Sequence, residues 1–164
     1  MLEKETLQRA RKDRAAGKSP STQAGEFVRE EIHHVREGKH GARSTKQAIA
    51  IGLSKARRAG VKLRPPKRAK ASTKRSARYA TRAARRRARP SDRRARAVRR
   101  ALKREGHRAA SRKALARQAR SAASRRPRSA RRAAARRAVR TKGPRGRHAA
   151  AQRAARTRRR RHAA

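Results

Sequence analysis

The sequence lacks several residue types on which proteins commonly build a core or a catalytic site. It has no cysteine and no tryptophan, and only one phenylalanine and one tyrosine. The absence of cysteine excludes disulfide bonds and thiolate zinc sites. No apolar run approaches the roughly 20 residues of a membrane span, and the first ten residues lack the apolar centre of a secretory signal. We therefore expect a cytoplasmic protein.

Negative charge is also scarce, because the sequence has 9 Asp and Glu residues and 56 Lys and Arg residues. The formal net charge is +47. Alanine accounts for 38 residues, whereas Met, Leu, Ile, Val, Phe and Tyr together account for 17. Low hydrophobicity with high net charge is typical of chains that cannot offset their ordering entropy. The sequence thus excludes one core spanning all 164 residues, and a polyphosphate is the expected partner.

The two ends of the chain differ in composition. Residues 1–63 contain 15 basic and 7 acidic residues with 12 of the 17 bulky apolar residues, while residues 64–164 contain 41 basic and 2 acidic residues. The pair Pro65-Pro66 marks a boundary, since neither residue can continue a helix. We predict a weak N-terminal helix in residues 1–18, a helical hairpin in residues 19–63 and a low-complexity Arg/Ala-rich tail in residues 64–164.

The hairpin prediction depends on caps and helical spacing. A fraying helix is expected over residues 2–16 with Gly17 as its stop. Either Ser19-Pro20 or Ser21-Thr22 begins the next helix, which ends at Gly38. One apolar face is predicted for this helix, while Glu30 and its neighbours on the opposite face are expected to be solvated. The apolar residues are Ala24, Phe27, Val28, Ile32 and Val35.

A second helix is expected from Thr45 to about Ala59, closed by Gly60. The residues Ser44-Thr45-Lys46-Gln47 match a capping box, in which Ser44 and Gln47 satisfy each other's backbone amides. Gly52 lies within the apolar face despite its low helix propensity, which indicates a close helix contact. Val61 and Leu63 are expected to fold back over the hairpin. A hairpin of this size is marginal alone, so dimerisation through it is a further expectation.

The stretch from Ser21 to Leu63, above all the run RSTKQAIAIGLSKARRAG at residues 43–60, resembles a family of small basic bacterial proteins. Members of that family are mostly uncharacterised and are sometimes labelled plasmid stabilization or DNA-binding proteins. The resemblance implies an association with DNA and supplies no catalytic residues.

The tail is cut by prolines and glycines into helix-sized pieces. Ser91-Asp92 caps a piece that reaches Glu105, Ser111 caps another, and residues 129–142 and 148–162 form two more. Alanine and arginine favour helix, whereas neighbouring like charges repel. We expect the tail to be disordered when free and helical where phosphates neutralise it. Its composition resembles the tails of linker histones and of bacterial histone H1-like proteins, with Arg in place of most Lys.

The sequence predicts an all-α protein, a small N-terminal helical hairpin followed by a long disordered or conditionally helical basic tail. The expected function is histone H1-like, largely non-sequence-specific binding and compaction of duplex DNA at the nucleoid or on a plasmid. The alternatives are an RNA-binding or ribosome-associated protein, and a protein-docking hairpin tethered to nucleic acid by its tail. The scarcity of aromatic residues favours duplex DNA, because single-strand readers use stacking platforms.

The candidate nucleic-acid-binding residues are basic residues of the second hairpin helix, of the segment after it, and of the tail. They are Arg43, Lys46, Arg57, Arg58, Lys62, Arg85, Arg86, Arg87, Arg93, Arg94, Arg99, Arg100, Arg131, Arg132, Arg136, Arg137, Arg158, Arg159, Arg160 and Arg161. Four of them, Arg43, Lys46, Arg57 and Arg58, fit two interpretations. They are consistent with a recognition helix or with contacts to the DNA backbone, and we favour the latter.

Three other features of the sequence give weaker indications of function. Glu30, His33, His34, Glu37 and His40 contain the Glu-x-x-His spacing of carboxylate-bridged metal sites, which need a second copy of the motif, so we interpret them as a solvated polar face. Glu31 falls inside the apolar face, where it either pairs with a basic residue of the second helix or lies at the edge in water. No catalytic constellation is visible, so we expect no enzyme activity, no cofactor and no resident metal.

Overall fold

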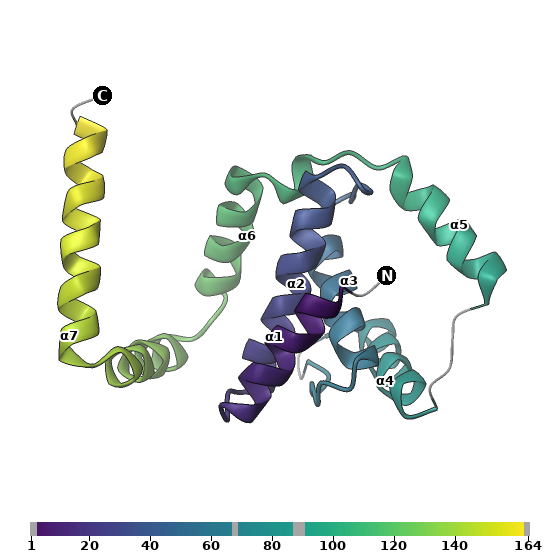
Figure 1. Cartoon of the computed structure of the whole chain (residues 1–164), viewed down its shortest axis with the longest axis horizontal. Coiled ribbons are helices and arrows are strands. Elements are labelled where there is room, and N and C mark those ends of the chain that lie inside the picture. The colour runs from purple at the N-terminus through teal and green to yellow at the C-terminus, as the bar shows by residue number, and fades with distance from the viewer. Residues whose placement is uncertain (1–2, 67–68, 87–90, 163–164) are drawn as a thin grey trace. The chain divides into compact units, whose positions relative to one another are not determined.

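The computed structural model describes residues 3–66, 69–86 and 91–162, with the side chains of residues 161 and 162 excepted. The chain divides into two compact units, Met1–Gln118 and Ala119–Ala164. The first unit contains the helices α1 (Lys4–Ala15), α2 (Pro20–Arg36), α3 (Thr45–Arg58), α4 (Ala71–Arg85) and α5 (Asp92–Lys103), the 3-10 turn η1 (Arg108–Ala110), and the start of α6 (Arg112–Ser124). The second contains the rest of α6 and α7 (Arg128–His162). Figure 1 shows the order of these elements.

The helical class agrees with the sequence, but the prediction of a small hairpin followed by a disordered tail is wrong. Helices continue through the basic region, from α4 to α7. Two pieces begin at the predicted caps, α5 after Ser91 and α6 after Ser111, whose Oγ accepts a hydrogen bond from Ala114 N at 3.2 Å. Intrinsic propensity explains the difference, because Ala and Arg are strong helix formers while each repelling pair costs only about 0.2–0.5 kcal/mol.

The last helix, α7, contains one interruption. Gly143 has φ 63° and ψ 178°, and Pro144 follows it, so two helical stretches meet there at a kink. A positive φ is readily adopted by glycine, and the missing N–H of proline suits the first turn of the second stretch. The sequence predicted a break at this place, between pieces at 129–142 and 148–162, and the kink lies in that gap.

The hairpin of α2 and α3 forms as the sequence predicts, with small changes in its caps. Ser19 caps α2, and its Oγ accepts a hydrogen bond from Thr22 N at 3.4 Å. At the start of α3, Ser44 Oγ accepts from Gln47 N at 3.2 Å. The reciprocal bond of the capping box is displaced by one residue, since Gln47 Oε1 accepts from Arg43 N at 2.8 Å instead of from Ser44 N.

Gly52 brings α2 and α3 close together, as predicted. A Cβ atom at this position would lie 2.7 Å from Val28 Cα and 2.9 Å from the carbonyl oxygen of Phe27. Both atoms belong to the backbone of α2, which cannot move aside as a flexible side chain does. Only glycine therefore allows this helix contact.

One apolar cluster joins α1, α2, α3 and the segment after α3. Phe27, Ala24 and Ala56 are fully buried there, Ala10 and Val61 are nearly so, and Leu63 packs against the cluster. The return of Val61 and Leu63 over the hairpin is thus confirmed. The N-terminal helix is better anchored than predicted, because Thr6 and Ala10 are buried and Arg9 Nε donates to Glu26 Oε2 at 2.9 Å.

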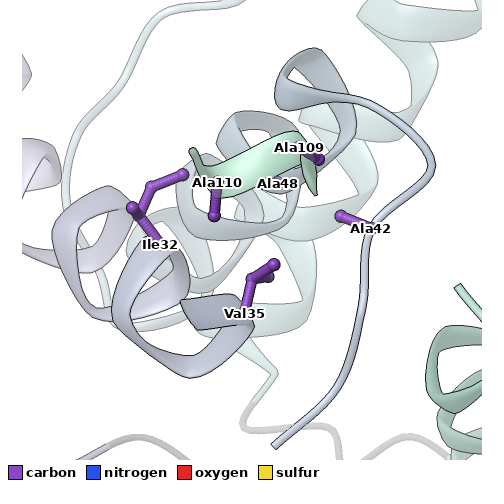
Figure 2. Close-up of a cluster of buried hydrophobic side chains, with 6 residues drawn as sticks. All are labelled: Ile32, Val35, Ala42, Ala48, Ala109 and Ala110. Atoms are coloured by element: carbon purple, nitrogen blue, oxygen red, sulfur yellow. The ribbon is translucent and has the colours of Figure 1, made fainter. Parts of the chain in front are cut away.

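A second apolar cluster brings residues after position 100 into the core. Figure 2 shows Ala109 and Ala110 of η1 lying against Ile32, Val35, Ala42 and Ala48. Polar bonds hold the same contact, since Thr45 Oγ1 donates to Ala109 O at 2.6 Å and Arg36 Nε donates to Ala110 O at 2.8 Å. This contact was missed because alanines carry little sequence signal. It lies within the first unit, which extends to Gln118.

The polar side of α2 is solvated only in part, whereas the sequence predicts a fully solvated face. Glu30 and His34 are buried, with 3% and 7% of their surface exposed, whereas His33 and Glu37 are exposed. Glu31 is fully buried and lies beside Lys55 of α3, with Glu31 Oε2 2.7 Å from Lys55 Nζ. Of the two alternatives for Glu31, the structure has the ion pair with the second helix.

Glu3 attaches the start of α1 to the end of α2 and the loop after it. Its Oε1 lies 2.8 Å from His34 Nε2 and 3.2 Å from Lys39 Nζ. The hydrogen bond from His34, together with that from Lys39, lowers the pKa of the Glu3 carboxyl to about 2. Glu3 therefore stays ionised at neutral pH.

No helix within the described ranges combines the length and the apolar character that a membrane span requires.

Candidate nucleic-acid interface

A groove lined by basic residues runs between the end of α3, the segment after it and α4. It has a volume of about 910 Å³. Its cationic side chains come from all three of these elements, and no carboxylate is found among the described residues that line it. These side chains are Arg57, Lys62, Arg64, Arg78, Arg82 and Arg85. Such a concentration of positive charge without counter-charges attracts anions.

The sequence places the α4 side of this groove on one helix face. Arg78, Arg82 and Arg85 follow one another at steps of four and three residues, which align side chains along a helix. The opposite side of α4 supplies Ala77 and Ala80, which are buried, and α4 packs against α3. The small alanines let α4 approach α3, and that approach brings its arginines to the groove.

Arg57 is the unusual member of this group. Only 8% of its surface is exposed, and its Nε atom is buried without a hydrogen-bond partner. Burial lowers the pKa of the Arg57 guanidinium from its ordinary value, although arginine stays protonated in proteins. Because a buried N–H donor without a partner is costly, an anion that accepts a hydrogen bond from Arg57 Nε offsets that cost. Arg57 therefore lies in the wall of the groove and not at an exposed position.

The basic residues of α3 do not form one recognition surface. Lys46 and Arg58 are exposed, but a rise of 1.5 Å per residue puts them about 18 Å apart along the axis. Arg57 lies within about 20° of Lys46 around the helix, yet that side is covered where α4 packs. The exposed basic residues of α3 are therefore separated along the helix and are not gathered at one place, which favours contacts to the DNA backbone.

Most other predicted contact residues are exposed, as the prediction requires. In the first unit these are Arg43, Lys46, Arg58, Lys62, Arg85, Arg86, Arg93, Arg94, Arg99 and Arg100. In the second unit they are Arg131, Arg132, Arg136, Arg137, Arg158, Arg159 and Arg160. Arg87 lies outside the described residues, as does the side chain of Arg161.

The second unit presents arginine on every side. Residues 119–164 contain 18 basic residues and no acidic residue. Among the side chains described there, none is buried and none forms an ion pair. On the first half of α7, Arg132, Arg136, Arg137 and Arg140 border one hollow with Ser129 and Ala133. This unit offers a helical surface of guanidinium groups that face water.

Several interface residues were missed at the level of the sequence. Arg64, Arg78 and Arg82 line the groove, yet the basic run in which they occur resembles every other part of the tail. Tyr79 is 55% exposed and borders a hollow with Arg58 and Arg75. The alternation of alanine and arginine along residues 71–85 was the available signal for an amphipathic helix.

The chain was compared with protein families, with curated proteins and with solved structures. No curated protein and no solved structure matches it. Residues 11–68, about a third of the chain, match a family of unknown function, DUF6496. The matched segment covers the end of α1 and all of α2 and α3.

Proposed function

We propose that the protein binds duplex DNA without sequence preference and neutralises its phosphates, in the manner of a histone H1-like protein. One observation carries the proposal. The second unit exposes its arginines along helices with no acidic residue to pair with them. Duplex DNA carries one negative charge per about 1.7 Å of its axis, so it is a partner of matching charge density.

The chemistry of arginine supports contact with phosphate in particular. A planar guanidinium donates two parallel hydrogen bonds to a phosphate, and arginine also enters narrow minor grooves. Such contacts position a protein but carry no sequence information. If about 10 phosphates are neutralised together, the logarithm of the association constant falls with the logarithm of salt concentration at a slope near −9.

The groove in the first unit has a separate part in this proposal. Its arginines converge on one place, and Arg57 lacks an anion to offset its burial. A phosphate in the groove satisfies Arg57 and the arginines of α4 together. With one phosphate site on each unit, a single protein engages two stretches of duplex, which gives a route to compaction at the nucleoid.

The test is salt-dependent binding of the full chain to fluorescently labelled nucleic acids. We expect duplexes of two unrelated sequences to bind with affinities within about twofold, with the steep slope given above. A marked preference for one duplex sequence would contradict the proposal. Tighter binding of an RNA of equal phosphate content would support the RNA-binding alternative instead, to which Tyr79 could contribute by stacking on a base.

The groove is tested by two triple variants that remove equal charge. Arg78→Gln, Arg82→Gln and Arg85→Gln change the groove, while Arg93→Gln, Arg94→Gln and Arg96→Gln change exposed positions of α5. We expect the groove variant to lose at least about tenfold more affinity for duplex than the α5 variant, since it loses converging contacts. Equal losses would show that only total charge matters.

A further inference from the structure

A group of three side chains at the end of α2 and in the loop after it has no part in phosphate binding. Glu31 and His34 belong to α2, and His40 follows in the loop before α3. One carboxylate oxygen and one ring nitrogen from each histidine all lie within 4.8 Å of one another. The side chains of Glu31 and His34 are 0% and 9% exposed, and that of His40 is 18% exposed.

The carboxylates of this region are short of hydrogen-bond donors. All four oxygens of Glu30 and Glu31 are buried, and none accepts a hydrogen bond. Lys55 lies near both residues, with Nζ 2.7 Å from Glu31 Oε2 and 3.6 Å from Glu30 Oε1. These are contacts between charges that lack hydrogen-bond alignment. One ammonium thus faces two buried carboxylates, which leaves a deficit of positive charge where burial makes it costly.

His40 points its Nε2 atom at one of these oxygens. Its Nδ1 donates a hydrogen bond to Gly41 O at 3.0 Å, so in the neutral ring Nε2 carries a lone pair. That Nε2 lies 3.3 Å from Glu31 Oε1. Two lone pairs facing each other repel unless a cation lies between them. A histidine that donates its second ring N–H to a backbone carbonyl is the usual arrangement of a metal ligand.

The distance between Glu31 and His40 suits two ligands of a tetrahedral metal ion. Bonds of about 2.0–2.1 Å to nitrogen and oxygen place neighbouring ligand atoms about 3.3 Å apart in a tetrahedron, the distance between Glu31 Oε1 and His40 Nε2. Two imidazoles and one carboxylate favour zinc and similar transition metals over magnesium or calcium. We propose that Glu31, His34 and His40 bind a divalent transition-metal ion of the zinc class.

Neighbouring charges are compatible with a cation at this place. Glu30 lies on the same side of α2, and its Oε1 is 3.9 Å from His34 Nε2. Glu3, whose Oε1 lies 2.8 Å from the same nitrogen, is a carboxylate within reach of the fourth position. A metal bound to His34 Nε2 takes the place of the hydrogen bond between this nitrogen and Glu3 Oε1. Lys55 stays on the other oxygen of Glu31, and Lys39 stays near Glu3.

A metal at this place joins three parts of the first unit. Glu3 precedes α1, Glu31 and His34 lie on α2, and His40 belongs to the loop that leads into α3. Because the ion binds the folded arrangement and not the unfolded chain, it stabilises the fold in proportion to its affinity.

The experiment uses the full chain without an affinity tag, dialysed against chelator and then titrated with zinc in a calorimeter. We expect one zinc ion per chain, and a higher midpoint of thermal unfolding when zinc is present. His40→Gln removes one of the proposed ligands and should weaken zinc binding by about 100-fold or more. Because His40 lies in a loop, this change should leave the helices intact. His33→Gln, at an exposed position of α2, is the matched control and should bind zinc as the wild type does.

Cobalt provides a second readout of the same site. Cobalt(II) in a tetrahedral site gives visible absorption that the octahedral aqueous ion lacks, and we expect this band for the wild type and His33→Gln but not for His40→Gln. Far-ultraviolet circular dichroism checks that both variants keep their helices. Failure of the wild type to bind zinc, or equal binding by the two variants, would overturn the proposal. In that case a proton shared between Glu31 and His40 is what relieves their repulsion.

Discussion

The two units of the chain are both rich in alanine and arginine, but they differ in acidic residues and in buried side chains. The first unit, Met1–Gln118, contains all nine acidic residues and every buried side chain among the described residues. The second, Ala119–Ala164, contains neither, and its described part is helical nonetheless. Helix formation in this protein therefore does not require a core, whereas the packing of helices requires both apolar contacts and counter-charges.

The largest difference between the two units is expected in the stability lost when an apolar residue is replaced by alanine. Phe27 is fully buried in the first unit, so Phe27→Ala should destabilise it by about 3–5 kcal/mol. Val139 is 47% exposed on α7, so Val139→Ala should change stability by less than about 0.5 kcal/mol. Urea unfolding monitored by circular dichroism measures both changes. A similar loss for the two variants would mean that Val139 is buried in solution.

Two glycines within helices of the first unit allow a finer comparison of packing. Gly52→Ala should cost about 1–3 kcal/mol, because the new methyl group meets the backbone of α2. At Gly25, an added Cβ would meet no other atom within 4 Å. Gly25→Ala should therefore raise stability by up to about 1 kcal/mol through the higher helix propensity of alanine. Opposite signs in thermal unfolding are the expected result. Equal signs would show that α2 and α3 do not meet at Gly52.

A smaller effect than that of Phe27→Ala is expected at Arg57, the one buried arginine among the described residues of the first unit. Arg57→Met removes the unpaired buried Nε–H and should raise the free energy of unfolding by about 1 kcal/mol. The slope of the logarithm of the association constant for DNA against the logarithm of salt concentration should become shallower by about one unit. Arg58→Met, at the exposed neighbouring position, should leave stability within about 0.5 kcal/mol of the wild type. A loss of stability in Arg57→Met would show that Arg57 is already satisfied inside the protein.

The sequence predicted the parts of the fold that depend on strong local signals. Ser19, Ser44, Gly38 and Gly60 mark helix ends through backbone geometry, and the spacing around Phe27 predicts the apolar face of α2. Disorder after residue 63 was predicted from composition, and there helix propensity outweighed repulsion. The contact of Ala109 and Ala110 with α2 could not be predicted, because alanines in contact look the same in sequence as exposed alanines.

The candidate sites were predictable to different degrees. The exposed arginines of α7 follow from charge alone, because a chain with few carboxylates cannot pair them. The groove required the packing of α4 on α3, which buries Arg57 and gathers Arg78 and Arg82 beside it. The residue types of Glu31 and His40 are visible in the sequence, but their approach is not, since a loop brings His40 back to α2.

The central claim is that exposed, unpaired arginines of the second unit bind the phosphates of DNA. The most direct test replaces Arg131, Arg132, Arg136, Arg137, Arg158, Arg159 and Arg160 by glutamine in the full chain and measures duplex binding from about 0.1 to 0.4 M salt. Each lost phosphate contact should make the slope shallower by about 0.9, so a change of up to about 6 units is expected. An unchanged slope would contradict the claim.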